Sequence, residues 1–76
     1  MSSKLPRLTP TQAIHMIEKI GFRLVRQSGS HKIYKNFQGI RITIPFHKGK
    51  ILHPKIVKSI MKDAQIDAET LRNLAS

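Results

Sequence analysis

Residues 40–46 have the sequence Ile-Arg-Ile-Thr-Ile-Pro-Phe. Apolar side chains alternate here with Arg41 and Thr43, which is the period of two residues expected of an antiparallel strand with one buried face. Turn-forming residues separate this segment from two earlier segments that are rich in strand formers. The predicted strands are residues 22–27, 31–36 and 40–46, joined as an antiparallel meander.

Helices are predicted before and after this meander in the sequence. Thr9 is expected to be an N-cap, with Gln12 completing a capping box, and Gly21 is a good C-terminal stop. Apolar residues between these points fall on one helical face, so a helix is predicted over residues 10–20. The remaining helices are expected from Pro54 onward and, after a cap at Asp67, over residues 68–74.

The resulting order is α-β-β-β-α with a short C-terminal helix, an α+β class of fold. With 76 residues, the chain is expected to form one domain over residues 1–76. The economical packing places two helices on one face of a three-stranded antiparallel sheet, which leaves the other face open to a ligand. Several unrelated small folds share this order, so the order alone does not indicate a function.

Charge is the strongest global feature of the sequence. Fourteen Lys and Arg residues oppose four Asp and Glu residues, which gives a formal net charge of +10. Solubility requires a net charge of only about 2–8 in a small domain. A polyanionic partner is therefore expected, with nucleic acid favoured over an acidic protein and an anionic membrane.

Composition excludes several other classes of protein. The absence of cysteine excludes disulfides, thiolate zinc sites and thiol catalysis. The four histidines lack the spacing of a zinc-binding helix, so neither a metal nor another cofactor is expected. No apolar run approaches the ~20 residues that span a bilayer, and the first residues do not resemble a secretory signal. We therefore expect a cytoplasmic protein without a membrane partner.

His31 is the best candidate for a catalytic residue. It follows Gly29 and Ser30 at the point where a tight turn becomes a strand. Glycine leaves room for a phosphate, and serine offers a hydroxyl and a backbone N–H to a phosphate oxygen. An imidazole in this position could take a proton from a ribose 2′-OH or give one to a leaving 5′-oxygen. The alternative is an ordinary surface histidine at a hairpin.

The other candidate residues surround the hairpin and the loop after the third strand. His47 is a candidate second phosphate contact or proton donor. Tyr34 and Phe37 are candidates for stacking on bases, or for packing. Lysines on the second helix are expected to form a solvated face. The candidate RNA-binding residues are Arg26, Lys32, Lys35, Arg41, Lys48 and Lys50.

Residues 21–34, with the sequence GFRLVRQSGSHKIY, resemble the core of HicA-type (YcfA-like) toxins, as do residues 42–47 and the helix over residues 54–66. The resemblance implies a fold similar to the double-stranded-RNA-binding domain and a metal-independent mRNA interferase. It implies that the histidine of the Gly-Ser-His motif, here His31, is catalytic, and that Gly29 and Ser30 shape its turn. It also implies a HicB-type antitoxin as partner, encoded by the adjacent gene.

Three hypotheses follow from these observations. The first is a toxin of a type II toxin–antitoxin system that cleaves mRNA with His31 as general acid or base. The second is an RNA-binding module of the same fold that does not cut, in which loss of His31 would matter little. The third is a decayed toxin that retains only antitoxin binding.

Overall fold

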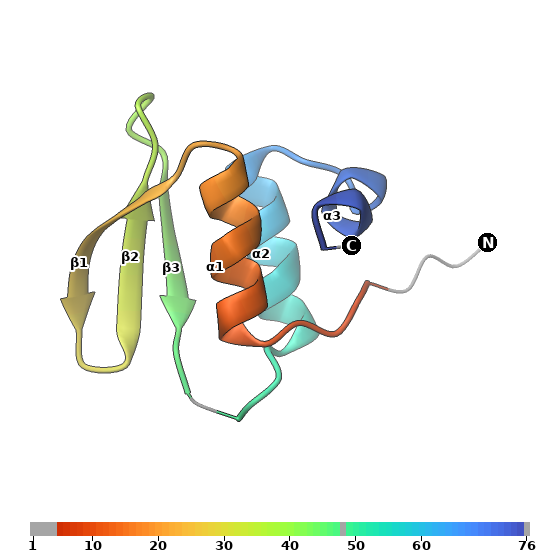
Figure 1. The fold of residues 1–76 in the computed structure, drawn as a ribbon, viewed down its shortest axis with the longest axis horizontal. Coiled ribbons are helices and arrows are strands. Elements are labelled where there is room, and N and C mark those ends of the chain that lie inside the picture. Colours follow the sequence, from red (N-terminus) through yellow and green to blue (C-terminus); the bar gives the residue numbers. More distant parts are fainter. Residues whose placement is uncertain (1–4, 48, 76) are drawn as a thin grey trace.

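The computed structural model describes residues 5–47 and 49–75, which form three helices and one three-stranded sheet (Figure 1). The predicted α+β class and the order of the elements are confirmed. A likeness to the double-stranded-RNA-binding domain stays a prediction. The elements are α1 (Pro10–Lys19), β1 (Arg23–Ser28), β2 (His31–Lys35), β3 (Arg41–Pro45), α2 (Pro54–Ala64) and α3 (Ala68–Ala75).

Helix α1 begins with the predicted capping box. The Gln12 amide donates to Thr9 Oγ1 at 3.2 Å, and the Thr9 amide donates to Gln12 Oε1 at 2.9 Å. Each bond satisfies a backbone donor that has no partner within the helix. The helix ends one residue earlier than expected, and Gly21 follows it with a φ of +101°. This left-handed conformation suits glycine, so the predicted stop is confirmed.

Side chains also cap the two later helices. His53 precedes α2, and its Nδ1 accepts the Lys55 amide at 3.0 Å. Asp67 precedes α3, and its carboxylate accepts the Thr70 amide at 2.8 Å, as the sequence predicted. Hydrogen bonds from the Thr70 side chain and backbone lower the pKa of the Asp67 carboxyl.

The strands pair in the order β1-β2-β3, and both pairs are antiparallel. β1 begins at Arg23 rather than at the predicted Phe22. The Phe22 amide donates to the Ile17 carbonyl at 3.0 Å, so Phe22 belongs to the turn that leaves α1. Its ring is 1 % exposed and lies in the core.

The core lies between the helices and one face of the sheet. Ile42 and Ile44 are buried while Arg41 and Thr43 are exposed, which confirms the alternation expected of this strand. The other fully buried side chains of the largest size are Phe22, Ile17, Leu71 and Val57.

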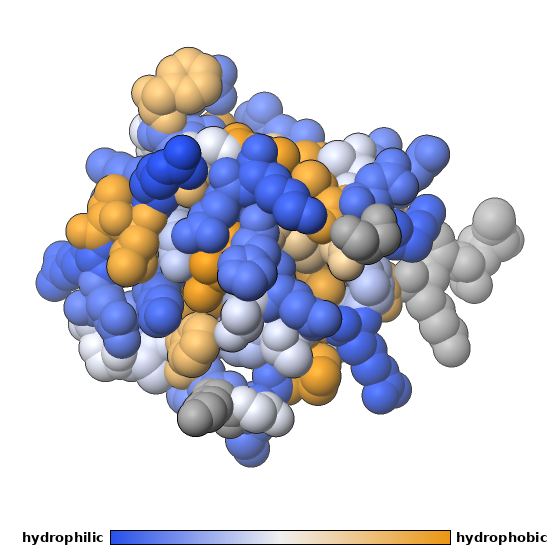
Figure 2. Space-filling view, in the orientation of Figure 1, coloured by the Kyte–Doolittle hydropathy of each residue, from blue (hydrophilic) through white to orange (hydrophobic). Residues whose placement is uncertain are grey.

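The helices do not cover the whole sheet. Figure 1 shows β3 nearest to α1 and α2 and β1 farthest from them. All six residues of β1 are exposed. Hydrophobic atoms are visible over β1 in Figure 2, where Leu24 and Val25 are 49 % and 54 % exposed. The β1–β2 hairpin therefore projects beyond the helical layer.

Candidate active site

The sheet face turned away from the helices carries three cross-strand rows. Directly opposite residues in antiparallel strands place their side chains on the same face, so the register of the strands defines these rows. We call this surface the open face. Its rows are Arg23–Lys35–Arg41, Arg26–Ile33–Thr43 and Ser28–His31–Pro45.

His31 lies at one end of the open face. It is the first residue of β2, its side chain is exposed, and it pairs with Ser28 and Pro45. The preceding Ser30 carbonyl accepts the Phe46 amide at 2.6 Å. This bond ties the hairpin turn to the end of β3, so the backbone next to His31 is held on both sides.

Gly29 shapes the turn before His31. Its φ is +58°, and a Cβ added there would meet nothing within 4 Å. The left-handed conformation accounts for the glycine, because L side chains adopt it only at a cost. The space above Gly29 is open to a ligand that approaches the Ser30 and His31 backbone.

Four cations lie in the other two rows of the open face. Arg26 lies in the middle row, and Lys35 and Arg41 are neighbours in the row farthest from His31. Lys35 is four positions after His31 along β2, which corresponds to roughly 13 Å. Arg23 completes that row, although the sequence analysis did not single it out. Only the strand register could have placed it there.

The register separates Lys32 from this group. Lys32 pairs with Ile44, so its side chain leaves the sheet on the face opposite to His31. Its ammonium lies over the Phe46 ring, 4.2 Å from the ring centroid. This geometry is typical of a cation–π contact.

The loop between β3 and α2 forms a cavity of about 360 Å³ beside the open face. We call it the loop cavity. His47 and Lys50 line it, and so does Pro45, the strand partner of His31. The structure therefore brings His47 and Lys50 together, next to the strand partner of His31. Lys48 lies outside the described residues.

The aromatic candidates lie elsewhere. Tyr34 is 3 % exposed and is part of the core. Burial, followed by the negative charge of Glu18, raises the pKa of the Tyr34 hydroxyl. Phe37 is 94 % exposed but lies in the turn between β2 and β3, at the opposite end of β2 from His31.

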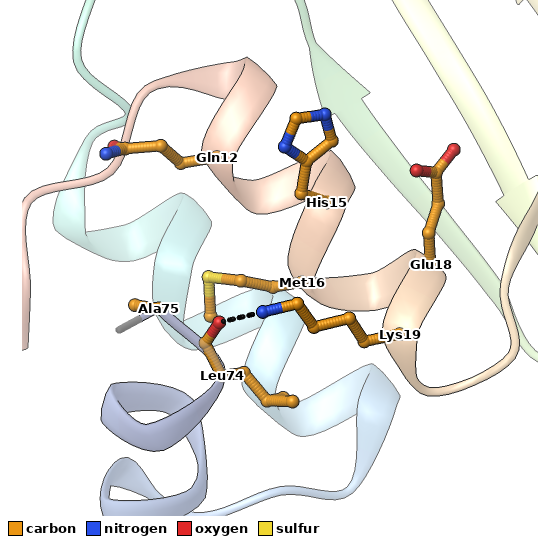
Figure 3. Close-up of a pocket in the computed structure, with 7 residues that line it drawn as sticks. All are labelled: Gln12, His15, Met16, Glu18, Lys19, Leu74 and Ala75. Carbon is orange, nitrogen blue, oxygen red and sulfur yellow. Dashed lines mark hydrogen bonds between the residues drawn. The ribbon is translucent and has the colours of Figure 1, made fainter.

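Another cavity, of about 500 Å³, lies between α1 and α3 (Figure 3). Its polar residues include His15, Glu18 and Lys19, and none of its lining residues belongs to the sheet. Figure 3 shows the Lys19 ammonium donating to the Leu74 carbonyl, at 3.0 Å. Lys19 therefore stabilises the C-terminal end of α3. Glu18 lines the same cavity and would repel a phosphate, so this cavity is a poorer candidate for RNA binding than the open face.

The distribution of acids strengthens the positive potential of the open face. The chain has four acidic residues, and none lies on the sheet or in the loop after it. Glu18 belongs to α1, Asp63 to α2 and Glu69 to α3, while Asp67 is the α3 cap. Within residues 5–47 and 49–75, no three His, Cys, Asp or Glu side chains are grouped as a metal site would need. Nor does any helix in this part have the length and apolarity needed to cross a membrane.

The fold and the open face define a small cationic α+β protein with one histidine at the end of a basic sheet surface. A family model described as the HicA toxin of bacterial toxin–antitoxin systems matches residues 11–66. The chain therefore belongs to the HicA toxin family, which confirms the resemblance, and it is the toxin member of a toxin–antitoxin pair. The matched residues include the open face, α2 and the residues of the loop cavity other than Pro10. The search of curated proteins found no match.

Proposed function

We propose that the chain is a metal-independent endoribonuclease that cleaves mRNA, with His31 as general acid or base. The observation that carries this proposal is the position of His31. It is exposed beside an open turn, at one end of a sheet face with four cations and no acid. An RNA strand crossing this face would place phosphates on the cations and one phosphate at His31.

The chemistry uses the ribose itself. The 2′-oxygen attacks the adjacent phosphorus and loses its proton, while the bond to the 5′-oxygen breaks and that oxygen gains a proton. The products are a 2′,3′-cyclic phosphate and a free 5′-hydroxyl, and DNA is spared because it lacks the nucleophile. His31 transfers one of these protons, and Arg26 stabilises the extra negative charge on the pentacovalent phosphorus.

The proposal extends to the partner and the compartment. The family match implies an antitoxin, and we propose that it is a HicB-type protein encoded by the adjacent gene. A net charge of +10 favours a more acidic partner that covers the open face and excludes RNA. Because mRNA is the substrate, the toxin acts in the cytoplasm.

The test compares the wild-type protein with His31→Ala on a defined mRNA in EDTA, with the matching DNA as a control. We expect the wild type to cut the RNA alone. Loss of one positioned histidine should slow cleavage by about 10²–10⁴-fold, while the affinity for RNA changes little. A wild type that binds RNA and never cuts it would instead support a binding module or a decayed toxin. Cleavage abolished by EDTA would contradict the metal-independent mechanism.

A further inference from the structure

The loop cavity has the composition of a site for a partly apolar ligand. Its walls are largely apolar and include Pro10, Pro45 and Ile56. Ile51 also lines it and is 54 % exposed, so an apolar side chain remains open to solvent. A cavity of about 360 Å³ falls within the range of roughly 300–1,000 Å³ that is usual for small-ligand sites.

The polar side chains that line the cavity are those of one lysine and two histidines. Lys50 supplies an ammonium group, and His47 lies on the same turn, where the Lys50 amide donates to the His47 carbonyl at 3.0 Å. His53 Nδ1 accepts the Lys55 amide, which leaves Nε2–H as the donor of that ring. No acidic residue lines the cavity. These groups suit a ligand with acceptor atoms on its edge and a negative charge beside it.

The cavity is joined to His31 by the backbone. Pro45 lines the cavity and is the residue directly opposite His31. Such partners have Cα atoms about 4.5–5.5 Å apart. The Phe46 amide donates to the Ser30 carbonyl at 2.6 Å, and the Leu52 amide donates to the Leu8 carbonyl at 2.7 Å. The first of these bonds joins the end of β3, beside the cavity, to the turn that precedes His31.

We propose that the loop cavity binds one base of the RNA strand, that of a nucleotide adjoining the scissile phosphate at His31. The base lies against Ile51, its acceptor atoms face His53 and Lys50, and its own phosphate lies near Lys50. This subsite orients the 2′-hydroxyl for in-line attack, because it fixes the nucleotide on one side of the reacting bond. The inference rests on the proposed ribonuclease activity.

The test removes the base and the apolar wall separately. RNA oligonucleotides are made with a single abasic ribose at each position around a mapped cut, and cleavage is measured under single-turnover conditions. The proteins are wild type, Ile51→Ala and Val25→Ala. Val25 is a matched control because it is also 54 % exposed but lies on β1, away from the cavity.

We expect one abasic position next to the cut to slow wild type and Val25→Ala by about tenfold, because the missing base no longer contacts Ile51 or accepts hydrogen bonds from His53 and Lys50. The same abasic substitution should slow Ile51→Ala by less than about threefold, because the wall that the base would contact is already gone. Equal penalties in all three proteins, or no sensitive position, would overturn the subsite while leaving ribonuclease activity intact.

If the wild type cuts nothing, the ribonuclease proposal is wrong, but the base subsite can still be tested by binding. The affinity of the same three proteins for intact and abasic RNA would then decide the matter. A penalty present in wild type and Val25→Ala and absent in Ile51→Ala supports a base in the cavity, and equal penalties overturn it.

Discussion

Alanine substitutions at two glycines should distinguish an effect on catalysis from an effect of backbone strain, because only one of the two glycines lies beside His31. Gly29 and Gly39 have φ values of +58° and +82°, and a Cβ at either position would meet nothing within 4 Å. Gly29→Ala and Gly39→Ala should each lower the free energy of unfolding by about 1 kcal/mol, because alanine is strained in this region. Only the methyl group at Gly29 lies where a phosphate would approach His31. Cleavage should therefore fall in Gly29→Ala and stay near wild type in Gly39→Ala, and single-turnover assays with urea unfolding measure both.

Tyr34 makes stability depend on pH at the alkaline end. Burial and the charge of Glu18 raise the pKa of its hydroxyl above the ordinary value of 10.0 in the folded state. The unfolded chain therefore loses this proton first, so the free energy of unfolding falls as pH rises above 10. Tyr34→Phe should remove this part of the decrease, as urea titrations at several pH values would show. A wild type and variant with parallel pH profiles would contradict the assignment.

At the scale of elements, local chemistry explains how far the sequence predicts the fold. The capping box at Thr9, the stop at Gly21 and the cap at Asp67 depend on contacts within a few residues, and all three are confirmed. The alternation of apolar and polar residues in β3 likewise predicts which of its side chains are buried. The exposure of β1 is not encoded locally, because it depends on which strands the helices cover.

The candidate site likewise contains one residue that the local sequence predicts and others whose positions depend on strand pairing. Sequence context alone singles out His31, and the structure shows it exposed beside Gly29. The positions of Lys32 and Arg23 depend instead on pairing register. A shift of one residue moves a side chain to the other face of the sheet, and nothing in the local sequence states that register.

The row farthest from His31 should contribute to binding RNA rather than to the chemical step. Lys35→Ala removes one cation of that row, and Lys58→Ala removes one from the exposed surface of α2. The plot of log affinity against log salt should become shallower by about 0.7 in Lys35→Ala, the effect of one lost phosphate contact on single-stranded RNA. Lys58→Ala should retain the wild-type slope. Equal slopes in both variants would place RNA elsewhere on the molecule.

For the whole molecule, the net charge of +10 couples stability to function. The Cα radius of gyration is 11.7 Å, so many cations lie within the screening length of about 10 Å that holds at 0.1 M salt. Their repulsion destabilises the folded chain. Bound RNA or an acidic antitoxin relieves the same repulsion, so either partner should stabilise the toxin beyond its direct contacts.

Salt should therefore have opposite effects on the free toxin and on its complex with RNA. Between 0.1 and 1 M sodium chloride the screening length falls to about 3 Å, so the Tm of the free protein should rise while RNA affinity falls. Lys58→Glu tests the cause, because it replaces a like-charge pair with Lys62 by an opposite pair, one turn apart on α2. This variant should have a higher Tm at low salt and a smaller rise with salt, with unchanged cleavage. A Tm rise as large as in wild type would show that sodium chloride acts through something other than charge repulsion.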